Sequence, residues 1–349
     1  MYKKLFPTLY FLGLIILTLS ACVLARSRTN HRVMTVTGYP DAATLGLMLP
    51  HEHIFTDFSG AETVTPRYDR EEAFQFALPY LKKLKASGVN TIVECTPNYI
   101  DRDVALLKRL SEASGLNIIT NTGYYAAVNF KYLPKHAYTE TAQQLAGRWI
   151  TEWRDGIAGT NVRPGFIKLG VGNAPLAPIE RKLIEAAAIT HLRTGLKIYI
   201  HTGDGKAAVE EADLLQSKGV SPSALIWVHA QNDATGVYQQ QLAQRGVTIS
   251  LDGYSPQQKA KYIGHLNQLK KASLLHKVIL SHDNGFAVEL EDGKITFKAF
   301  GGQAGDIYTS IQTDLIPALL KAGFDQQEID LMTKTNPAKA LTIEVLMAN

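Results

Sequence analysis

The sequence predicts an α/β fold, a (β/α)₈ TIM barrel with C-terminal closing helices. Short apolar runs rich in β-branched residues alternate with longer amphipathic stretches through most of the 349 residues. This alternation is typical of parallel strands connected by helices, and eight such units are what a closed barrel needs. No glycine-rich loop follows the first apolar run, so a doubly wound dinucleotide-binding sheet is disfavoured.

The predicted strands end in the polar residues that could bind a metal ion. Several are apolar on both faces, as expected when helices cover one face and packed side chains fill the other. They occupy residues 45–51, 90–96, 116–123, 165–171, 196–203, 224–231, 247–253 and 277–284.

Amphipathic periodicity predicts a helix after each strand. The helical candidates are residues 70–87, 102–114, 139–157, 179–194, 205–217, 234–244, 256–271 and 306–321. Residues 325–349 predict one or two terminal helices that close the barrel. The remaining long segments, 124–138 and 287–306, are expected to be loops that carry substrate specificity.

The N-terminus has the layout of a targeting segment rather than of a barrel strand. Lys3 and Lys4 precede an apolar run over residues 5–19, which is typical of a secretory signal. The run ends in LSAC (residues 19–22), which resembles the lipobox of bacterial lipoproteins, where the cysteine is lipidated. An ordinary cleaved signal and an uncleaved membrane anchor are the alternatives.

With the lipobox interpretation the chain has three parts, a signal peptide, a tether and a metal-dependent hydrolase barrel. They cover residues 1–22, 23–34 and 35–349. The protein is then expected to be exported and held in the cell envelope by lipid on Cys22. Cys95 is the only other cysteine, so no internal disulfide is expected. At the end of its strand Cys95 is either a nucleophile or a small buried apolar residue.

Composition narrows the range of partners. The chain is 46% hydrophobic and 19% charged, with a formal net charge of +4 to which two lysines of the leader contribute. Beyond the leader there is no basic run, so nucleic-acid binding has no electrostatic support. We expect a small-molecule substrate. A homodimer is one candidate for the oligomeric state, which the sequence leaves open.

Metal-ligand types end the predicted strands. Residues i and i+2 of a strand point the same way, so His51 and His53 can reach one ion, although either could instead bond a loop carbonyl. His201 and His229 occupy equivalent positions, and Asp283 lies at the end of the last predicted strand. Imidazoles and a carboxylate at the catalytic face of a barrel favour zinc or a similar divalent ion, with manganese, cobalt and iron as alternatives.

Lys168 ends the fourth strand and does not fit a plain ligand set, because cations repel an ammonium group. It either forms an ion pair or loses its proton and captures carbon dioxide as a carbamate. An N6-carboxylated Lys168 would bridge two metals as an anion. With Asp283 and a hydroxide it would leave the centre near +1, a charge that stabilises a developing oxyanion.

The chain resembles the phosphotriesterase family of the amidohydrolase superfamily, including its lactonase-like members. The similarity runs from about residue 34 to the C-terminus, in segments that keep the family's order. They read MLPHEHIFTDF, TPNYIDRDVALLKRLSEASGLNIITNTGYY, VRPGFIKLG, IYIHTGDG, LSHD and TNPAKAL.

The resemblance implies a binuclear metal centre with a specific division of ligands. His51, His53 and Asp283 would bind the more buried metal. His201 and His229 would bind the more exposed one, and carbamylated Lys168 would bridge the two.

The chain departs from the family's organophosphate hydrolases where substrate is selected. Tyr125 stands where those enzymes place a tryptophan, and LDGY (residues 251–254) stands where they carry a proton-relaying histidine. Their acidic run after the strand-six histidine is here AQND (residues 230–233). These differences favour a lactone or carboxylic ester with Tyr125 near the leaving oxygen, although Tyr125 could also be only an aromatic plug.

The sequence therefore predicts a hydrolase that opens a lactone or cleaves a related carboxylic ester by attack of metal-bound hydroxide, with Asp283 and Tyr125 as catalytic residues. Phosphotriester or phosphodiester hydrolysis at the same centre is the enzymatic alternative. A ligand-binding lipoprotein without turnover is the non-enzymatic one, although such a protein has little use for Lys168.

Overall fold

The computed structural model describes residues 31–63, 66–301 and 307–343. The predicted leader and Cys22 lie outside the described residues. Within the described ranges, no helix is both long and apolar enough to span a membrane.

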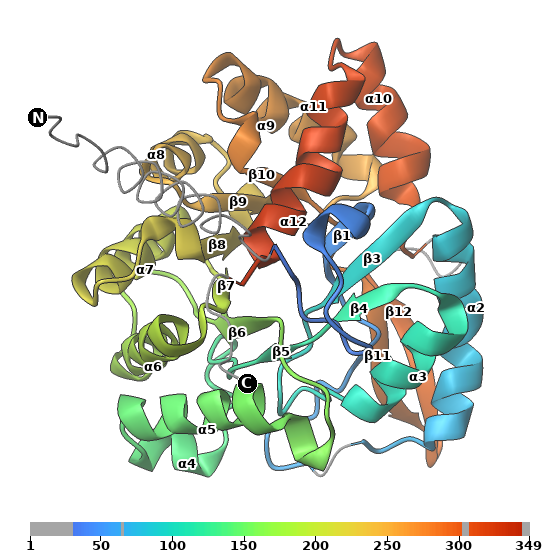
Figure 1. Ribbon diagram of the computed structural model, residues 1–349, viewed down its shortest axis with the longest axis vertical. Helices are drawn as coiled ribbons and strands as arrows, with labels where there is room; N and C mark the ends of the chain where they lie inside the picture. The colour runs from blue at the N-terminus through green and yellow to red at the C-terminus, as the bar shows by residue number, and fades with distance from the viewer. Residues whose placement is uncertain (1–30, 64–65, 302–306, 344–349) are drawn as a thin grey trace, which may run out of the picture.

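The strands form the predicted barrel, with the helices around it (Figure 1). The strands are β1 (Leu47–Glu52), β3 (Val89–Glu94), β4 (Asn117–Ile119), β5 (Asn121–Thr122), β6 (Phe166–Gly170), β7 (Lys197–His201), β8 (Leu225–Val228), β9 (Thr248–Leu251) and β10 (Val278–Leu280). They pair in parallel in the order β1-β3-β4 and β5-β6-β7-β8-β9-β10. The third predicted strand is divided into β4 and β5.

The barrel closes between its last and first strands through two hydrogen bonds. The Asp283 N–H donates to the His51 carbonyl at 3.1 Å. The His51 N–H donates to the Ser281 hydroxyl at 2.9 Å. Closure therefore brings Asp283 to the same place as the histidines of β1.

The predicted helices are present, most with ends shifted by a few residues, whereas the one predicted over residues 306–321 is α-helical only from Ile316 and is preceded by a π-helical turn (Ile311–Leu315). They are α2 (Arg70–Ala86), α3 (Val104–Ser114), α5 (Ala142–Asp155), α6 (Pro178–Thr194), α7 (Gly205–Ser217), α8 (Val237–Arg245), α9 (Lys259–Lys271) and α10 (Ile316–Lys321), with a short α4 (Lys135–Thr139) before α5. Local sequence sets several starts: Asp69 accepts hydrogen bonds from the first N–H groups of α2, and Thr141 with Gln144 forms a capping box at α5. The predicted terminal helices are α11 (Gln326–Asp330) and α12 (Asn336–Leu341), joined by a π-helical turn.

The segment predicted as a loop over residues 287–306 is largely a β-hairpin. Strands β11 (Gly285–Glu291) and β12 (Lys294–Phe300) pair antiparallel, and β11 also pairs with β2 (Phe55–Thr56). Asp292 and Gly293 form the turn with φ of 49° and 77°, the left-handed backbone that a tight hairpin needs. The loop prediction was therefore wrong for most of this segment.

Packing inside the barrel seals one end. Met48, Phe166 and Tyr199 belong to a buried cluster that also includes Val33 and Leu341, at the end where the strands begin. The Ile343 N–H donates to the Arg32 carbonyl at 3.4 Å. Since Val33 and Met34 are buried, the packed barrel begins within the range predicted as a tether.

The alternation of side chains along the strands places polar residues at the other end of the barrel, where the strands finish. Phe166 and Lys168 lie two residues apart on β6, and Tyr199 and His201 lie two residues apart on β7. Side chains two apart share a face, so the same alternation that fills the core with rings brings Lys168 and His201 to the open end.

Candidate metal centre

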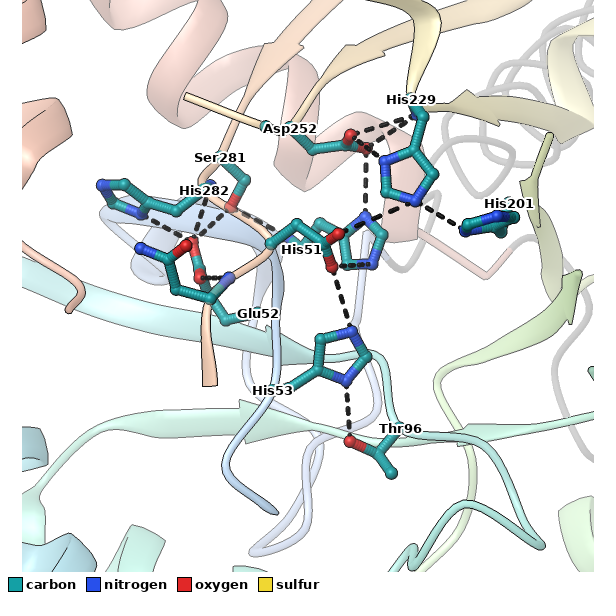
Figure 2. A network of polar contacts seen from close by, with 12 residues as sticks. His51, Glu52, His53, Thr96, His201, His229, Asp252, Ser281 and His282 are labelled. Carbon is teal, nitrogen blue, oxygen red and sulfur yellow. Dashed lines mark hydrogen bonds and ion pairs between the residues drawn. The ribbon is translucent and has the colours of Figure 1, made fainter. Parts of the chain in front are cut away.

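All predicted ligands line one cavity of about 220 Å³ at the carboxyl ends of the barrel strands. They are His51, His53, Lys168, His201, His229 and Asp283. They come from strands far apart in the sequence, and Figure 2 shows the histidines converging. The structure thus brings together every residue that the strand-end pattern singled out as a ligand.

One half of the centre is formed by His51, His53 and Asp283. The Asp283 Oδ1 atom lies 3.2 Å from His51 Nε2 and 3.1 Å from His53 Nε2. Ligands of a tetrahedral ion at 2.0–2.1 Å would lie about 3.3 Å from one another. The three atoms are therefore spaced as ligands of one ion would be.

The other half is formed by His201 and His229. His201 Nδ1 lies 2.7 Å from His229 Nε2, and His229 Nε2 lies 3.7 Å from Asp283 Oδ2. Two ring nitrogens this close need a shared proton or cation between their lone pairs. Asp283 faces both halves of the centre.

Lys168 is buried, with 2% of its surface exposed. Its Nζ atom lies 3.1 Å from His51 Nε2. Its positive charge also contributes to lowering the pKa of both His51 and His201, so it faces both halves.

Two ligand residues have strained backbones. His229 and Asp283 have φ of 63° and 61°, in the left-handed region that costs free energy for residues other than glycine. Such outliers gather at functional sites because the surrounding structure holds them there. Here the sharp turn after each strand aims the side chain at the cavity.

Asp252 was not predicted as part of the site, yet it orients two of the histidines (Figure 2). It is fully buried. One carboxylate oxygen lies 3.0 Å from His51 Nδ1 and the other 2.7 Å from His229 Nδ1. Each ring therefore carries its proton on Nδ1 and turns the Nε2 lone pair toward the cavity.

The side chains of His51, His229 and Asp252 also lie close enough together to resemble a separate metal site. Asp252 does not line the cavity. It also accepts hydrogen bonds from the His229 N–H at 3.1 Å and from Gln231 Nε2 at 3.2 Å. Its contacts are those of a positioning carboxylate. Asp252 directly follows β9, as His229 directly follows β8, so the strand-end rule could have found it.

His53 is oriented in a similar way by a hydroxyl. Thr96 Oγ1 lies 2.8 Å from His53 Nδ1 and is itself within 2.5 Å of Glu94 Oε1. The Thr96 hydroxyl donates to the carboxylate and accepts from His53, which again leaves Nε2 free to face the cavity.

Glu52 points away from the centre, as expected for the residue between two ligand histidines. Its Oε1 atom accepts from the Ser281 hydroxyl at 2.7 Å and from the His282 N–H at 3.0 Å. It also contacts His282 Nδ1 at 2.8 Å and accepts from the Asn284 N–H at 3.1 Å. Glu52 therefore fixes the loop that carries Asp283.

The pKa shifts of three of these side chains suit metal binding. For His229, burial lowers the pKa, but the charges of Asp252 and Asp283 raise it above its usual value. Burial, followed by the charge of Lys168, lowers the pKa of His51 to about 4. Burial and the charge of His229 lower the pKa of His201 well below its usual value. Burial alone would raise the pKa of Asp283, but His51 and His229 hold it below its usual range. Neutral His51 and His201 rings and an ionised Asp283 are the ligand forms.

The mouth of the cavity is largely apolar. Its walls include Phe58, Val128, Tyr132 and Phe300, of which Phe58 and Val128 are also exposed at the surface. Phe300 comes from the unpredicted hairpin. The mouth therefore favours a substrate with an apolar portion.

Tyr125 forms part of the wall beside His201, with the ring centres 5.0 Å apart. A Cβ on Gly170 would lie 2.3 Å from the Tyr125 ring, so the glycine of β6 permits this position. Cys95 also lines the cavity but is fully buried, and burial raises the pKa of its thiol well above the usual value. A protonated, buried thiol is a poor nucleophile.

The comparisons with known proteins agree with this geometry. Residues 31–341 match the sequence model of the Phosphotriesterase family. A phosphotriesterase homology protein of Escherichia coli is 31% identical, over 84% of this chain and 97% of that protein. An aryldialkylphosphatase of Saccharolobus solfataricus is 26% identical, over 86% of this chain and 96% of that protein.

Solved structures give the same result. A structure from work that engineered organophosphate hydrolysis activity from a weak promiscuous lactonase template has a TM-score of 0.78 and 28% identity, covering 89% of this chain and 99% of that one. An organophosphorus hydrolase from Deinococcus radiodurans has a TM-score of 0.77 and 28% identity, covering 90% of this chain and 98% of that one.

Proposed function

Since this chain belongs to the phosphotriesterase family and is a metal-dependent hydrolase, we propose that it opens a lactone or cleaves a related carboxylic ester. The observation that supports this function best is that four histidines, Asp283 and Lys168 line one cavity with an apolar mouth. A centre of two divalent ions accounts for this set of side chains better than a single ion does.

In the proposed assignment, which the resemblance implies, His51, His53 and Asp283 would hold one ion, and His201 and His229 would hold the other. Lys168, as its N6-carboxylated form, would supply an anionic oxygen donor to the pair. Zinc is the metal proposed, because imidazoles outnumber oxygen donors.

Bound here, the two ions supply Lewis acidity toward the substrate carbonyl and a lowered pKa for water. The chain's own groups then do the rest. Ionised Asp283 takes up the proton of the attacking water at its carboxylate. Asp252 keeps His51 and His229 in place, and the Tyr125 hydroxyl faces the oxygen that leaves. The apolar mouth excludes water and holds the rest of the substrate.

Phosphotriester hydrolysis is the second candidate, because relatives are named aryldialkylphosphatase and organophosphorus hydrolase. Tyr125 and the LDGY segment (residues 251–254) favour the carboxylic substrate, since they stand where the resemblance places the tryptophan and the histidine of the organophosphate hydrolases.

The test is turnover of a panel of lactones, carboxylic esters and phosphotriesters by protein loaded with zinc, manganese or cobalt, with metal content measured. We expect the highest kcat/KM on a lactone or carboxylic ester. Lys168→Ala should lower it by about 100-fold, and added propionate should restore part of it by replacing the lost carboxylate. Two metals per chain without turnover of any panel member would contradict the proposal in favour of a binding protein.

We also propose that the protein is an exported lipoprotein anchored through Cys22. Support comes from the apolar run after Lys3 and Lys4 and from LSAC at residues 19–22. Mass spectrometry of the mature N-terminus should find a lipidated cysteine, and Cys22→Ser should abolish the modification. A mature chain that starts elsewhere would contradict the assignment.

A further inference from the structure

A second cavity lies at the opposite end of the barrel from the metal centre. It measures about 90 Å³, several times the 10–15 Å³ that one water needs. Its walls are the residues that begin or precede successive strands, together with part of α12. They are Lys197, Ser223, Thr248, His276, Lys277, Asn336, Lys339 and Ala340.

The walls of this basal cavity are basic. Lys197, Lys277 and Lys339 line it with His276, and none of the described lining residues is acidic. Lys197 is only 9% exposed. Burial lowers the pKa of Lys277, and the positive charges of Lys339 and Lys197 lower it further. Holding the Lys277 and Lys339 ammonium groups close together costs free energy that an anion would recover.

The donors around the cavity suit an oxyanion. The ammonium of Lys277 already donates to the Gly246 carbonyl at 3.0 Å, which holds it in position and leaves two further hydrogens. The hydroxyls of Ser223 and Thr248 add donors at the strand ends. Asn336 adds none, because its amide nitrogen donates to the Leu275 and Val278 carbonyls at 2.8 and 2.7 Å.

The geometry points to the basal cavity as a binding site for a phosphate-type anion, either free phosphate or the headgroup of an anionic phospholipid. This inference does not depend on the proposed hydrolase activity. The charges of Lys277 and Lys339 around a volume of this size match a compact, doubly charged oxyanion better than a single carboxylate.

The position of the basal cavity bears on whether the anion is free phosphate or a phospholipid headgroup. The first described residues pack at the same end: the Val36 N–H donates to the Ile118 carbonyl at 2.9 Å, and Val33 is buried. If the segment before them ends in a lipid anchor, a phospholipid headgroup would be the anion close at hand.

The experiment is lysine footprinting of the purified full chain by amine acetylation, read at each lysine by mass spectrometry. One arm adds inorganic phosphate in neutral detergent, and the other uses phosphatidylglycerol vesicles with phosphatidylcholine vesicles for comparison. At ten times the dissociation constant, acetylation of Lys277 and Lys339 should slow about tenfold. Lys271, exposed on α9 and outside the cavity, should be unaffected.

Two variants separate a site from general charge. Lys339→Gln removes an exposed wall charge and should weaken the protection of Lys277, whereas Lys271→Gln should not. Protection by phosphate identifies the free anion, and protection only by phosphatidylglycerol identifies the headgroup. No protection in either arm, equal slowing at Lys271, or protection unchanged in Lys339→Gln would overturn the proposal.

Discussion

The Asp252 carboxylate contacts two imidazoles from different strands, one with each oxygen. Because it is fully buried, these bonds are made in a low dielectric and fix the rings firmly. A single residue thereby couples His51, on one half of the centre, to His229 on the other.

Replacing Asp252 by Asn should weaken metal binding. An amide can still bond one ring, but it cannot accept from both with a full charge, so the two Nε2 lone pairs lose their fixed direction. We expect metal affinity to fall by about 10–100-fold, measured by competition with a chelator. Asp233→Asn is the matched control: Asp233 is also a buried acid after a strand, but it bonds the N–H groups of Tyr238 and Gln239 at the start of α8. It should lose about 1 kcal/mol of stability and keep its metal affinity.

Removing the Tyr125 hydroxyl should slow turnover rather than disturb the fold. Tyr125→Phe keeps the ring that packs beside His201 but removes the donor proposed to face the leaving oxygen. We expect kcat on the preferred ester to fall by about 100-fold with little change in KM. Tyr124→Phe is the comparison, since that hydroxyl bonds His136 at 3.0 Å and does not line the cavity. Equal kcat values for Tyr125→Phe and wild type would reduce Tyr125 to an aromatic plug.

At the level of elements, the hairpin β11–β12 links stability to the site. Phe286 of β11 lies within 4.9 Å of the Phe76 ring centre on α2 and 4.8 Å of that of Tyr80. Phe300, at the end of β12, lines the cavity. The hairpin thus anchors one wall of the mouth to the helix layer.

Truncating the buried ring of this hairpin should be costly. Phe286 is 2% exposed and Leu290 of the same strand is 62% exposed. Phe286→Ala should lower the free energy of unfolding by about 3–5 kcal/mol, whereas Leu290→Ala should change it by less than about 0.5 kcal/mol. Chemical denaturation measures both. Similar losses in the two variants would contradict the packing described here.

The barrel was predictable because most strands contain a short apolar run, and the ligand cluster because parallel strands end at one face. The hairpin was missed, although Asp292-Gly293 between alternating residues is a hairpin signal. The segment was instead predicted as a loop that carries substrate specificity. Asp252 was noted only as part of the LDGY segment (residues 251–254), because its role depends on its contact with His51, 201 residues away. Contacts of this kind follow from barrel closure and cannot be predicted from local pattern.

Across the whole molecule, the two ends of the barrel differ in chemistry. The end where the strands begin is packed with apolar side chains and carries the basal cavity. The other end carries four imidazole rings, the Asp283 carboxylate and Lys168 around one cavity. The metal-ligand residues come from or follow β1, β6, β7, β8 and β10, so bound ions would join strands on both sides of the closure.

Metal removal should therefore lower the stability of the entire barrel. With free zinc at 100 times its dissociation constant, mass action stabilises the folded state by about 2.7 kcal/mol, which corresponds to a Tm increase of about 5 °C for a domain of this size. Calorimetry of the chelated protein, titrated with zinc, measures the shift. Magnesium should shift Tm little, because it prefers oxygen ligands and keeps its water. The double variant His201→Ala with His229→Ala should lose most of the zinc-dependent shift while Lys271→Gln keeps it. A Tm that zinc raises equally in that double variant would mean that the ions stabilise the chain somewhere other than at this centre.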